Sequence, residues 1–149
     1  MVRYVHFLGV VIAVVWLAAC QSGTSAPAET LPPAPAPSPD PTTADGIFTV
    51  AQAERGLQLY RDICSECHTT DDWTERGFRN RWEDESVFQL WYFINDRMPY
   101  EDPWTLTRQQ VTDVFTYILQ LNGLPTGDTE LATDDDSIDD YWIRWGGGR

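Results

Sequence analysis

The stretch Cys64-Ser65-Glu66-Cys67-His68 decides how the rest of the chain is interpreted. Two cysteines separated by two residues and followed by a histidine form the attachment signature of c-type haem. Each thiol adds to one vinyl group of the haem, and the histidine supplies the proximal iron ligand. A zinc site and a dithiol redox pair are the alternatives. Because zinc requires four ligands and a thioredoxin-like pair requires a βαβ context, we predict one covalently bound haem c.

The histidines and methionines are few enough to narrow the choice of iron ligands. The chain contains two of each, namely His6, His68, Met1 and Met98. His6 and Met1 fall in an N-terminal segment that we expect to be removed. If the iron has a second protein ligand of the usual kind, it is therefore Met98, which directly precedes Pro99. The alternative is that Met98 fills a gap in the core, as methionine often does.

Three features together resemble the class I cytochromes c. They are the haem motif, the run Arg97-Met98-Pro99-Tyr100, and an apolar helix around residues 114–119. The resemblance covers about residues 48–125. It implies a small all-α fold wrapped around one covalently bound haem, with His68 and Met98 as axial iron ligands. It also implies electron transfer as the function.

The N-terminus has the pattern of an export signal of the lipoprotein type. An apolar run over residues 5–16 is followed by the small-residue sequence Leu17-Ala18-Ala19-Cys20, which is similar to a bacterial lipobox. We therefore predict removal of residues 1–19, lipidation of Cys20, and a location on the periplasmic side of a bacterial membrane. Gln21, in place of aspartate, favours the outer membrane. A plain signal peptide or an uncleaved anchor is the alternative, although the run is short for a membrane-spanning helix of about 20 residues.

Residues 20–46 are predicted to be a disordered tether. Seven of the ten prolines lie between Pro27 and Pro41, interleaved with alanine, serine and threonine. Such a segment buries no core and favours the extended polyproline II conformation. It would let a folded domain stand away from the membrane. A ligand for SH3-type domains is the alternative, but it has little meaning in a periplasm.

The predicted cytochrome c domain covers residues 47–125 and contains three main helices. Apolar residues recur at helical spacing in each of them, and Thr107 with Gln110 forms a capping-box pattern before the last one. In the class I family the first and last helices cross closely, so Gly56 is expected at this crossing, against Tyr117. The alternative for Gly56 is a weak point in the helix, since glycine costs about 1 kcal/mol relative to alanine. The expected helices span residues 50–64, 84 or 86 to 96, and 108–121.

Residues 69–85 are polar and predict an irregular loop, with Gly77 as a turn residue. Arginine and tryptophan side chains in such a loop are suited to hydrogen-bond the propionate groups of haem. We name Arg79, Arg81 and Trp82 as candidates for these contacts. The alternative is a solvated loop that is held by one aromatic anchor.

Residues 126–149 are predicted to be an acidic and aromatic tail outside the domain. Acidic residues dominate positions 128–140, and such a run is usually solvated and disordered. An aromatic cluster follows, and two exposed tryptophans would be unusual on a free tail. Docking of this cluster on the domain or on a partner is therefore the other option. The cluster comprises Tyr141, Trp142, Ile143 and Trp145.

The charge of the chain restricts its partners. Ten arginines, no lysine and 23 acidic residues give a net charge of −13, and removal of Arg3 with the signal segment would make it −14. The charge therefore disfavours nucleic acid and other anionic partners. We expect redox partner proteins with a positive or apolar face. Adaptation to high salt is the alternative reason for so acidic a surface.

The combined prediction is a lipid-anchored monohaem cytochrome c that is not an enzyme. It would carry electrons between a dehydrogenase or quinol-oxidising complex and a terminal acceptor. A haem enzyme or gas-binding protein, such as a peroxidase, is one alternative, but Met98 and the absence of a distal histidine from the sequence argue against it. A fixed cytochrome subunit of a larger oxidoreductase is the other.

Overall fold

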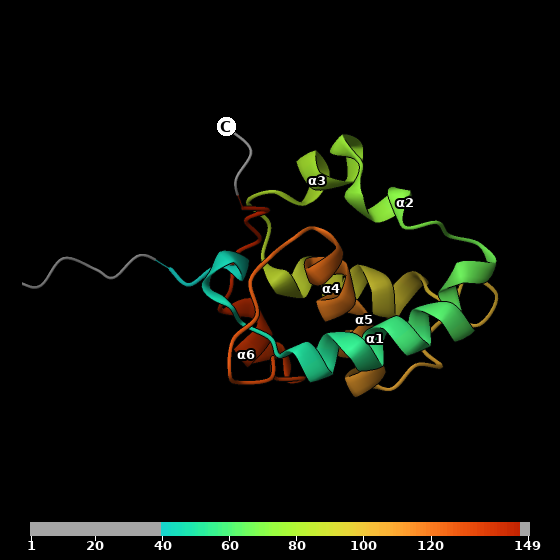
Figure 1. Ribbon diagram of the computed structural model, residues 1–149. Helices are drawn as coiled ribbons and strands as arrows, with labels where there is room; N and C mark the ends of the chain where they lie inside the picture. Colours follow the sequence, from blue (N-terminus) through green and yellow to red (C-terminus); the bar gives the residue numbers. More distant parts are fainter. Residues whose placement is uncertain (1–39, 147–149) are drawn as a thin grey trace, which may run out of the picture. The chain divides into compact units, whose positions relative to one another are not determined.

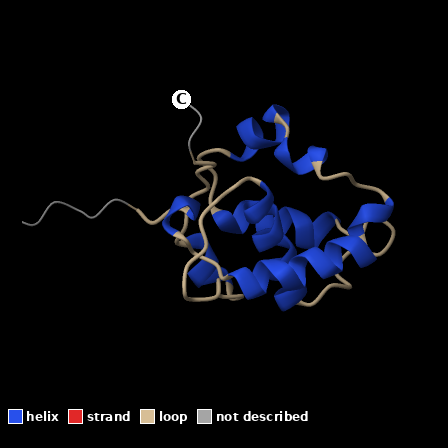
Figure 2. Ribbon diagram, viewed as in Figure 1, coloured by secondary structure: helices blue, strands red, loops and turns tan. Residues whose placement is uncertain are grey.

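The computed structural model describes residues 40–146, so the predicted signal segment, Cys20 and most of the tether lie outside the described residues. Within this range helices are the only regular elements apart from two isolated β-bridges (Figure 2), which confirms the all-α prediction. No helix in residues 40–146 is both long and apolar enough to cross a membrane. In chain order the elements of Figure 1 are the 3-10 turn η1 (Thr43–Asp45), α1 (Val50–Asp62), the 3-10 turn η2 (Cys64–Glu66), α2 (Asp71–Thr74), α3 (Arg76–Trp82), α4 (Val87–Arg97), α5 (Arg108–Leu121) and α6 (Asp135–Asp139).

Helices α1 and α5 cross at close range, as the resemblance to the class I cytochromes c implied. The Thr49 side chain caps α1 by accepting a hydrogen bond from the Gln52 backbone N–H at 3.2 Å. At the crossing, a Cβ atom on Gly56 would overlap the backbone carbonyl of Asp113 and lie 2.9 Å from Tyr117 Cβ. The prediction that Gly56 permits the approach of the two helices is thus confirmed.

Helices α4 and α5 form the centre of the core. The predicted capping box of α5 is present, because the Thr107 N–H donates to Gln110 Oε1 at 2.8 Å and the Gln110 N–H donates to Thr107 Oγ1 at 3.3 Å. Trp91 of α4 is fully buried, and its Nε1 donates to Thr112 Oγ1 of α5 at 2.8 Å. The one polar atom of this large side chain is therefore satisfied inside the core.

Residues 69–85 differ from the sequence prediction of an irregular loop, since they form the short helices α2 and α3. Three aromatic side chains in this polar segment account for the difference. Trp73, Phe78 and Trp82 pack in sequence, with ring centroids 5.6 Å apart for the first pair and 6.5 Å apart for the second. Their contacts with the core fix the helices, while most of the intervening residues are exposed.

The C-terminal segment packs on the domain, although the sequence analysis placed it outside. Leu131, Ile138, Ile143 and Trp145 are buried and belong to the same hydrophobic core as α4 and α5. Of the two options for the aromatic cluster, docking on the domain is the one that the structure adopts. The acidic residues between these anchors remain mostly exposed, so the acidic composition obscured a segment that is held by widely spaced apolar residues.

Hydrogen bonds attach this segment at both of its ends. The Gln52 side chain of α1 bonds the Leu131 backbone twice, donating from Nε2 at 3.0 Å and accepting from the amide at 2.9 Å. Near the other end, Thr43 Oγ1 donates to the Arg144 carbonyl at 2.8 Å and accepts from its amide at 2.9 Å. Buried polar side chains thus pair with the segment's backbone, which is the condition for burying that backbone at low cost.

Candidate haem site

The haem motif follows α1 directly and forms the tight turn η2. The backbone N–H groups of Cys67 and His68 both donate to the Cys64 carbonyl, at 3.2 and 3.0 Å. Both thiols are free, that of Cys64 half-buried and that of Cys67 exposed. Burial raises the pKa of the Cys64 thiol. The turn brings both thiols and the imidazole to the wall of one cavity.

Met98 reaches the same cavity from the end of α4. Its backbone N–H closes the last turn of the helix by donating to the Ile94 carbonyl at 2.9 Å, and its own backbone is extended. A cis peptide bond joins it to Pro99. The cavity has a volume of about 370 Å³, and the thioether side chain lines it together with the motif's cysteines and histidine. The structure therefore brings all four principal predicted site residues together.

The remaining walls of the cavity are mostly apolar. Ile94, Val114 and Ile118 line it from α4 and α5, and their helical spacing predicted that they face inward. The sequence analysis did not identify three further residues of the wall. They are Trp73 of α2, Phe93 of α4 and Leu106 of the loop before α5. For Trp73 and Leu106 the available signal was an aromatic or apolar residue between polar neighbours.

The donor set tests which group the cavity fits. An apolar cavity with two thiols, one imidazole and one thioether suits a largely apolar iron macrocycle that is attached through sulfur. Within residues 40–146 no group of three or more His, Cys, Asp or Glu side chains is placed to hold a metal ion. The zinc alternative therefore lacks the ligands that it requires, and the helical surroundings lack the βαβ unit of a dithiol enzyme.

His68 is held on several sides. Its Nδ1 lies 3.3 Å from Asp72 Oδ2, and the same carboxylate oxygen accepts from the Thr69 N–H at 3.0 Å. The Thr69 hydrogen bond, followed by the contact with His68, lowers the pKa of Asp72. Tyr60 Oη donates to the His68 carbonyl at 2.9 Å. With Nδ1 facing a carboxylate, Nε2 is the nitrogen left to bind a metal.

Trp73 lines the cavity and lies beside His68. Its ring lies 4.8 Å from the His68 ring, measured between centroids. Burial raises the pKa of the nearby Tyr60 hydroxyl, and the Trp73 N–H opposes part of that shift. The Trp73 Nε1 atom is itself fully buried, so it does not open onto the cavity, and by strict geometry it has no hydrogen-bond acceptor within residues 40–146.

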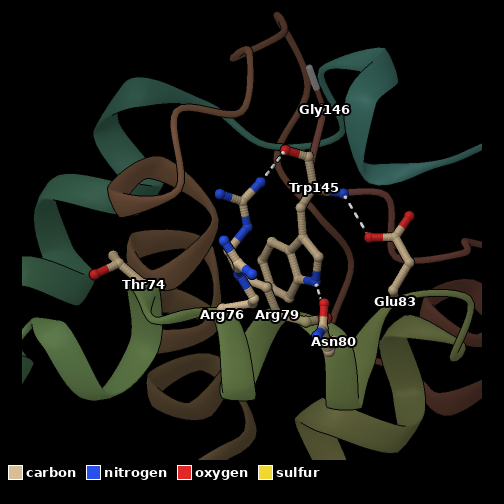
Figure 3. A pocket seen from close by; sticks show the side chains of 7 residues that line it. All are labelled: Thr74, Arg76, Arg79, Asn80, Glu83, Trp145 and Gly146. Atoms are coloured by element: carbon tan, nitrogen blue, oxygen red, sulfur yellow. Dashed lines mark hydrogen bonds between the residues drawn. The ribbon is translucent and has the colours of Figure 1, made fainter. Parts of the chain in front are cut away.

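Arg79, Arg81 and Trp82, the three predicted propionate contacts, do not line this cavity. The helical turn of α3 directs Arg79 to the C-terminal segment, where its guanidinium donates to the Trp145 carbonyl at 3.1 Å. The Arg79 carbonyl in turn accepts from Trp145 Nε1 at 2.8 Å (Figure 3). The Arg81 guanidinium lies over the rings of Trp82 and Phe93, 5.1 and 5.6 Å from their centroids. Arg79 and Trp145 border a separate cavity of about 630 Å³, which contains none of the four principal site residues.

Comparison with known proteins supports the assignment of the cavity. Residues 51–118 match the family model described as cytochrome C oxidase, cbb3-type, subunit III. No curated protein and no solved structure matches the chain. The matched range begins in α1, ends in α5, and includes the haem motif and Met98. The match indicates a c-type cytochrome domain in residues 51–118, consistent with the class I monohaem cytochromes c.

Proposed function

We propose that this protein carries single electrons through one haem c, attached to Cys64 and Cys67 and ligated by His68 and Met98. The observation that carries the proposal is that these four side chains, from two segments far apart in sequence, line one apolar cavity. The cytochrome match over residues 51–118 supports electron transfer by haem. Because Met/His ligation raises the reduction potential, the site suits a carrier from a dehydrogenase or quinol-oxidising complex to a terminal acceptor.

Each group in the site has a distinct role in this proposal. The thiols of Cys64 and Cys67 would add across the two haem vinyl groups, each forming one thioether that holds the haem. Asp72 orients the His68 ring through Nδ1, which would leave Nε2 to ligate the iron. The apolar walls exclude water, which sets the local dielectric and contributes to the potential. Bound haem iron supplies the one-electron couple.

None of the three predicted propionate contacts, Arg79, Arg81 and Trp82, lines the cavity, so no propionate partner is proposed. Arg79 and Arg81 face the C-terminal segment and α4.

The protein is proposed to be a carrier and not an enzyme, because ligands on both faces of the iron would leave no open position for a substrate. A second candidate is a fixed cytochrome subunit of a larger oxidoreductase. The description of the matching family, which names a subunit of an oxidase, favours it. Co-purification from native membranes separates the two, since a fixed subunit stays with its complex at high salt.

Membrane attachment through a lipid on Cys20 also remains a proposal. The signal pattern of residues 1–19 and the lipobox-like run at its end support it. The mature protein would then stand on the periplasmic side of a bacterial membrane, at the end of the proline-rich tether. Gln21, which follows Cys20 in place of an aspartate, favours sorting to the outer membrane.

Substitution of Met98 tests the proposed ligation. The haem-loaded protein should show the sharp bands of a reduced c-type cytochrome and, when oxidised, the weak long-wavelength band that sulfur ligation gives in this family. Met98→Ala should abolish that band and lower the midpoint potential, while the thioether-linked haem stays bound. Phe93→Leu, a change in the same cavity wall, is the matched control and should keep the band. Survival of the band in Met98→Ala would overturn the ligand assignment.

A further inference from the structure

Three exposed aromatic side chains come from two segments that also line the haem cavity, α4 and the loop of residues 99–106. Tyr100 is 86% exposed and also lines the cavity, and Trp104, four residues later, is 56% exposed. Tyr92 of α4 is 42% exposed, and its ring meets that of Trp104 edge to face, with centroids 5.8 Å apart. An exposed cluster of large aromatic residues marks an interaction site more often than scattered apolar residues do.

The loop that presents these rings is held by its own hydrogen bonds. The Asp102 N–H donates to the Pro99 carbonyl at 3.1 Å, and Thr105 Oγ1 donates to the Asp102 carbonyl at 2.8 Å. Both ends of the loop return to the haem cavity, through Met98 at one end and Leu106 at the other. The aromatic surface is therefore fixed relative to the proposed iron ligand.

Trp104 occupies a backbone conformation that glycine adopts more easily. Its φ angle is 69°, in the left-handed region that bulky side chains rarely enter. The residue is exposed and contributes nothing to the buried core, so the fold does not require tryptophan here. Strained residues that the surrounding structure maintains cluster at functional sites.

The charges around the cluster point to a cationic partner. Glu101 and Asp102 are exposed in the same loop, and within residues 40–146 neither forms an ion pair with an arginine. Arg97, the nearest cation in sequence, is already paired with Asp96 at 2.8 Å. Electron-rich ring faces beside unpaired carboxylates attract guanidinium and ammonium groups.

We propose that Tyr92, Tyr100 and Trp104, together with Glu101 and Asp102, form the docking surface for a redox partner protein. The partner presents arginine or lysine side chains around an apolar centre. Its cations lie on the Tyr92 and Trp104 rings and beside the two carboxylates, and its own cofactor faces the end of the haem cavity at Tyr100. This inference rests on the proposed electron transfer and names the surface and the partner chemistry through which it occurs.

Electron transfer to a basic probe tests the docking surface. The reduced, haem-loaded protein is mixed with an oxidised soluble cytochrome c that carries lysines around its haem edge, and the bimolecular rate is followed by stopped flow. Trp104→Gly should lower the rate about two- to fivefold, the range expected from an exposed cation–π contact. Its melting temperature should not fall, because glycine accepts the positive φ angle. Trp142→Ala, at an exposed tryptophan that does not line the cavity, is the control and should leave the rate unchanged.

A matched pair of charge variants separates local docking from total charge. Glu101→Gln with Asp102→Asn should lower the rate about threefold at low salt, and the difference should vanish near 1 M salt as the Debye length falls to about 3 Å. Asp139→Asn with Asp140→Asn removes the same charge from exposed residues at the end of α6 and should have a much smaller effect. Equal effects of the two pairs would overturn the proposal.

Further outcomes distinguish this inference from the proposed function. If all variants transfer electrons at the wild-type rate, the docking surface is refuted while electron transfer by haem stands. Binding to neutral phosphatidylcholine vesicles that Trp104→Gly abolishes would assign the surface to a membrane instead. Concentration-dependent dimerisation that the same variant abolishes would assign it to a second copy of the chain.

Discussion

Replacement of Gly56 by alanine is expected to destabilise the haem-loaded protein by about 2 kcal/mol. The added Cβ atom would overlap the Asp113 backbone carbonyl and lie 2.9 Å from Tyr117 Cβ. Overpacking typically costs about 1–3 kcal/mol, and the upper end applies because the obstacle is backbone. The higher helix propensity of alanine returns about 1 kcal/mol. For a domain of this size, the net loss lowers the melting temperature by about 8–16 °C.

Gly77→Ala is the matched control for this prediction. Gly77 also lies in a helix, α3, but a Cβ atom there would meet only the Glu75 side chain, at 3.4 Å or more. The change should be neutral or stabilise the protein by up to about 1 kcal/mol. Thermal and guanidinium unfolding of both haem-loaded variants measures the difference. Equal stability of the two variants would refute the close crossing of α1 and α5.

Other expectations concern the anchor, the acid response and the cofactor. Cys20→Ser should leave the protein soluble or with its signal uncleaved, as fractionation and mass spectrometry would report. Arg55 donates to both carboxylate oxygens of Glu130, at 2.8 and 2.9 Å, and these hydrogen bonds lower the pKa of Glu130. The pair therefore stabilises the fold above the ordinary carboxylate pKa of about 4.3 and loses this effect as pH falls through the lower folded value. Glu130→Gln should reduce the fall in unfolding free energy between about pH 6 and about pH 3, which denaturant titration measures. Cys64→Ala with Cys67→Ala should leave a largely disordered chain, because the small core depends on its cofactor; a well-dispersed NMR spectrum would contradict this.

The sequence predicted those parts of the fold that show a regular pattern. Three amphipathic helices, the capping box at Thr107 and the close approach at Gly56 each depend on local spacing or on one residue type, and each is present. The helices α2 and α3 were missed because polar residues surround their three aromatic anchors. The C-terminal segment was placed outside the domain because the spacing of its buried residues follows no regular period.

The site was predictable where the chemistry restricts residue types. Thiol attachment and iron ligation leave few possible residues in this chain, and Cys64, Cys67, His68 and Met98 line one cavity. Contacts with a haem propionate have no such restriction, since any arginine or tryptophan could donate a hydrogen bond to it. In α3 the Arg79 side chain is directed to the C-terminal segment, and docking of that segment on the domain was one of two options that the sequence left open.

Because the acidic C-terminal segment packs on the domain, the role of its charge must be tested by substitution and not by deletion. Deletion of residues 128–140 would remove Leu131 and Ile138 from the core, so any loss of electron transfer would mix unfolding with electrostatics. Asp139 and Asp140 are exposed and form no ion pair within residues 40–146. Their conversion to asparagine removes two charges and keeps every apolar anchor. Because the anchors fix the segment, its carboxylates have fixed positions on the domain, and their effect on a partner depends on which face the partner approaches.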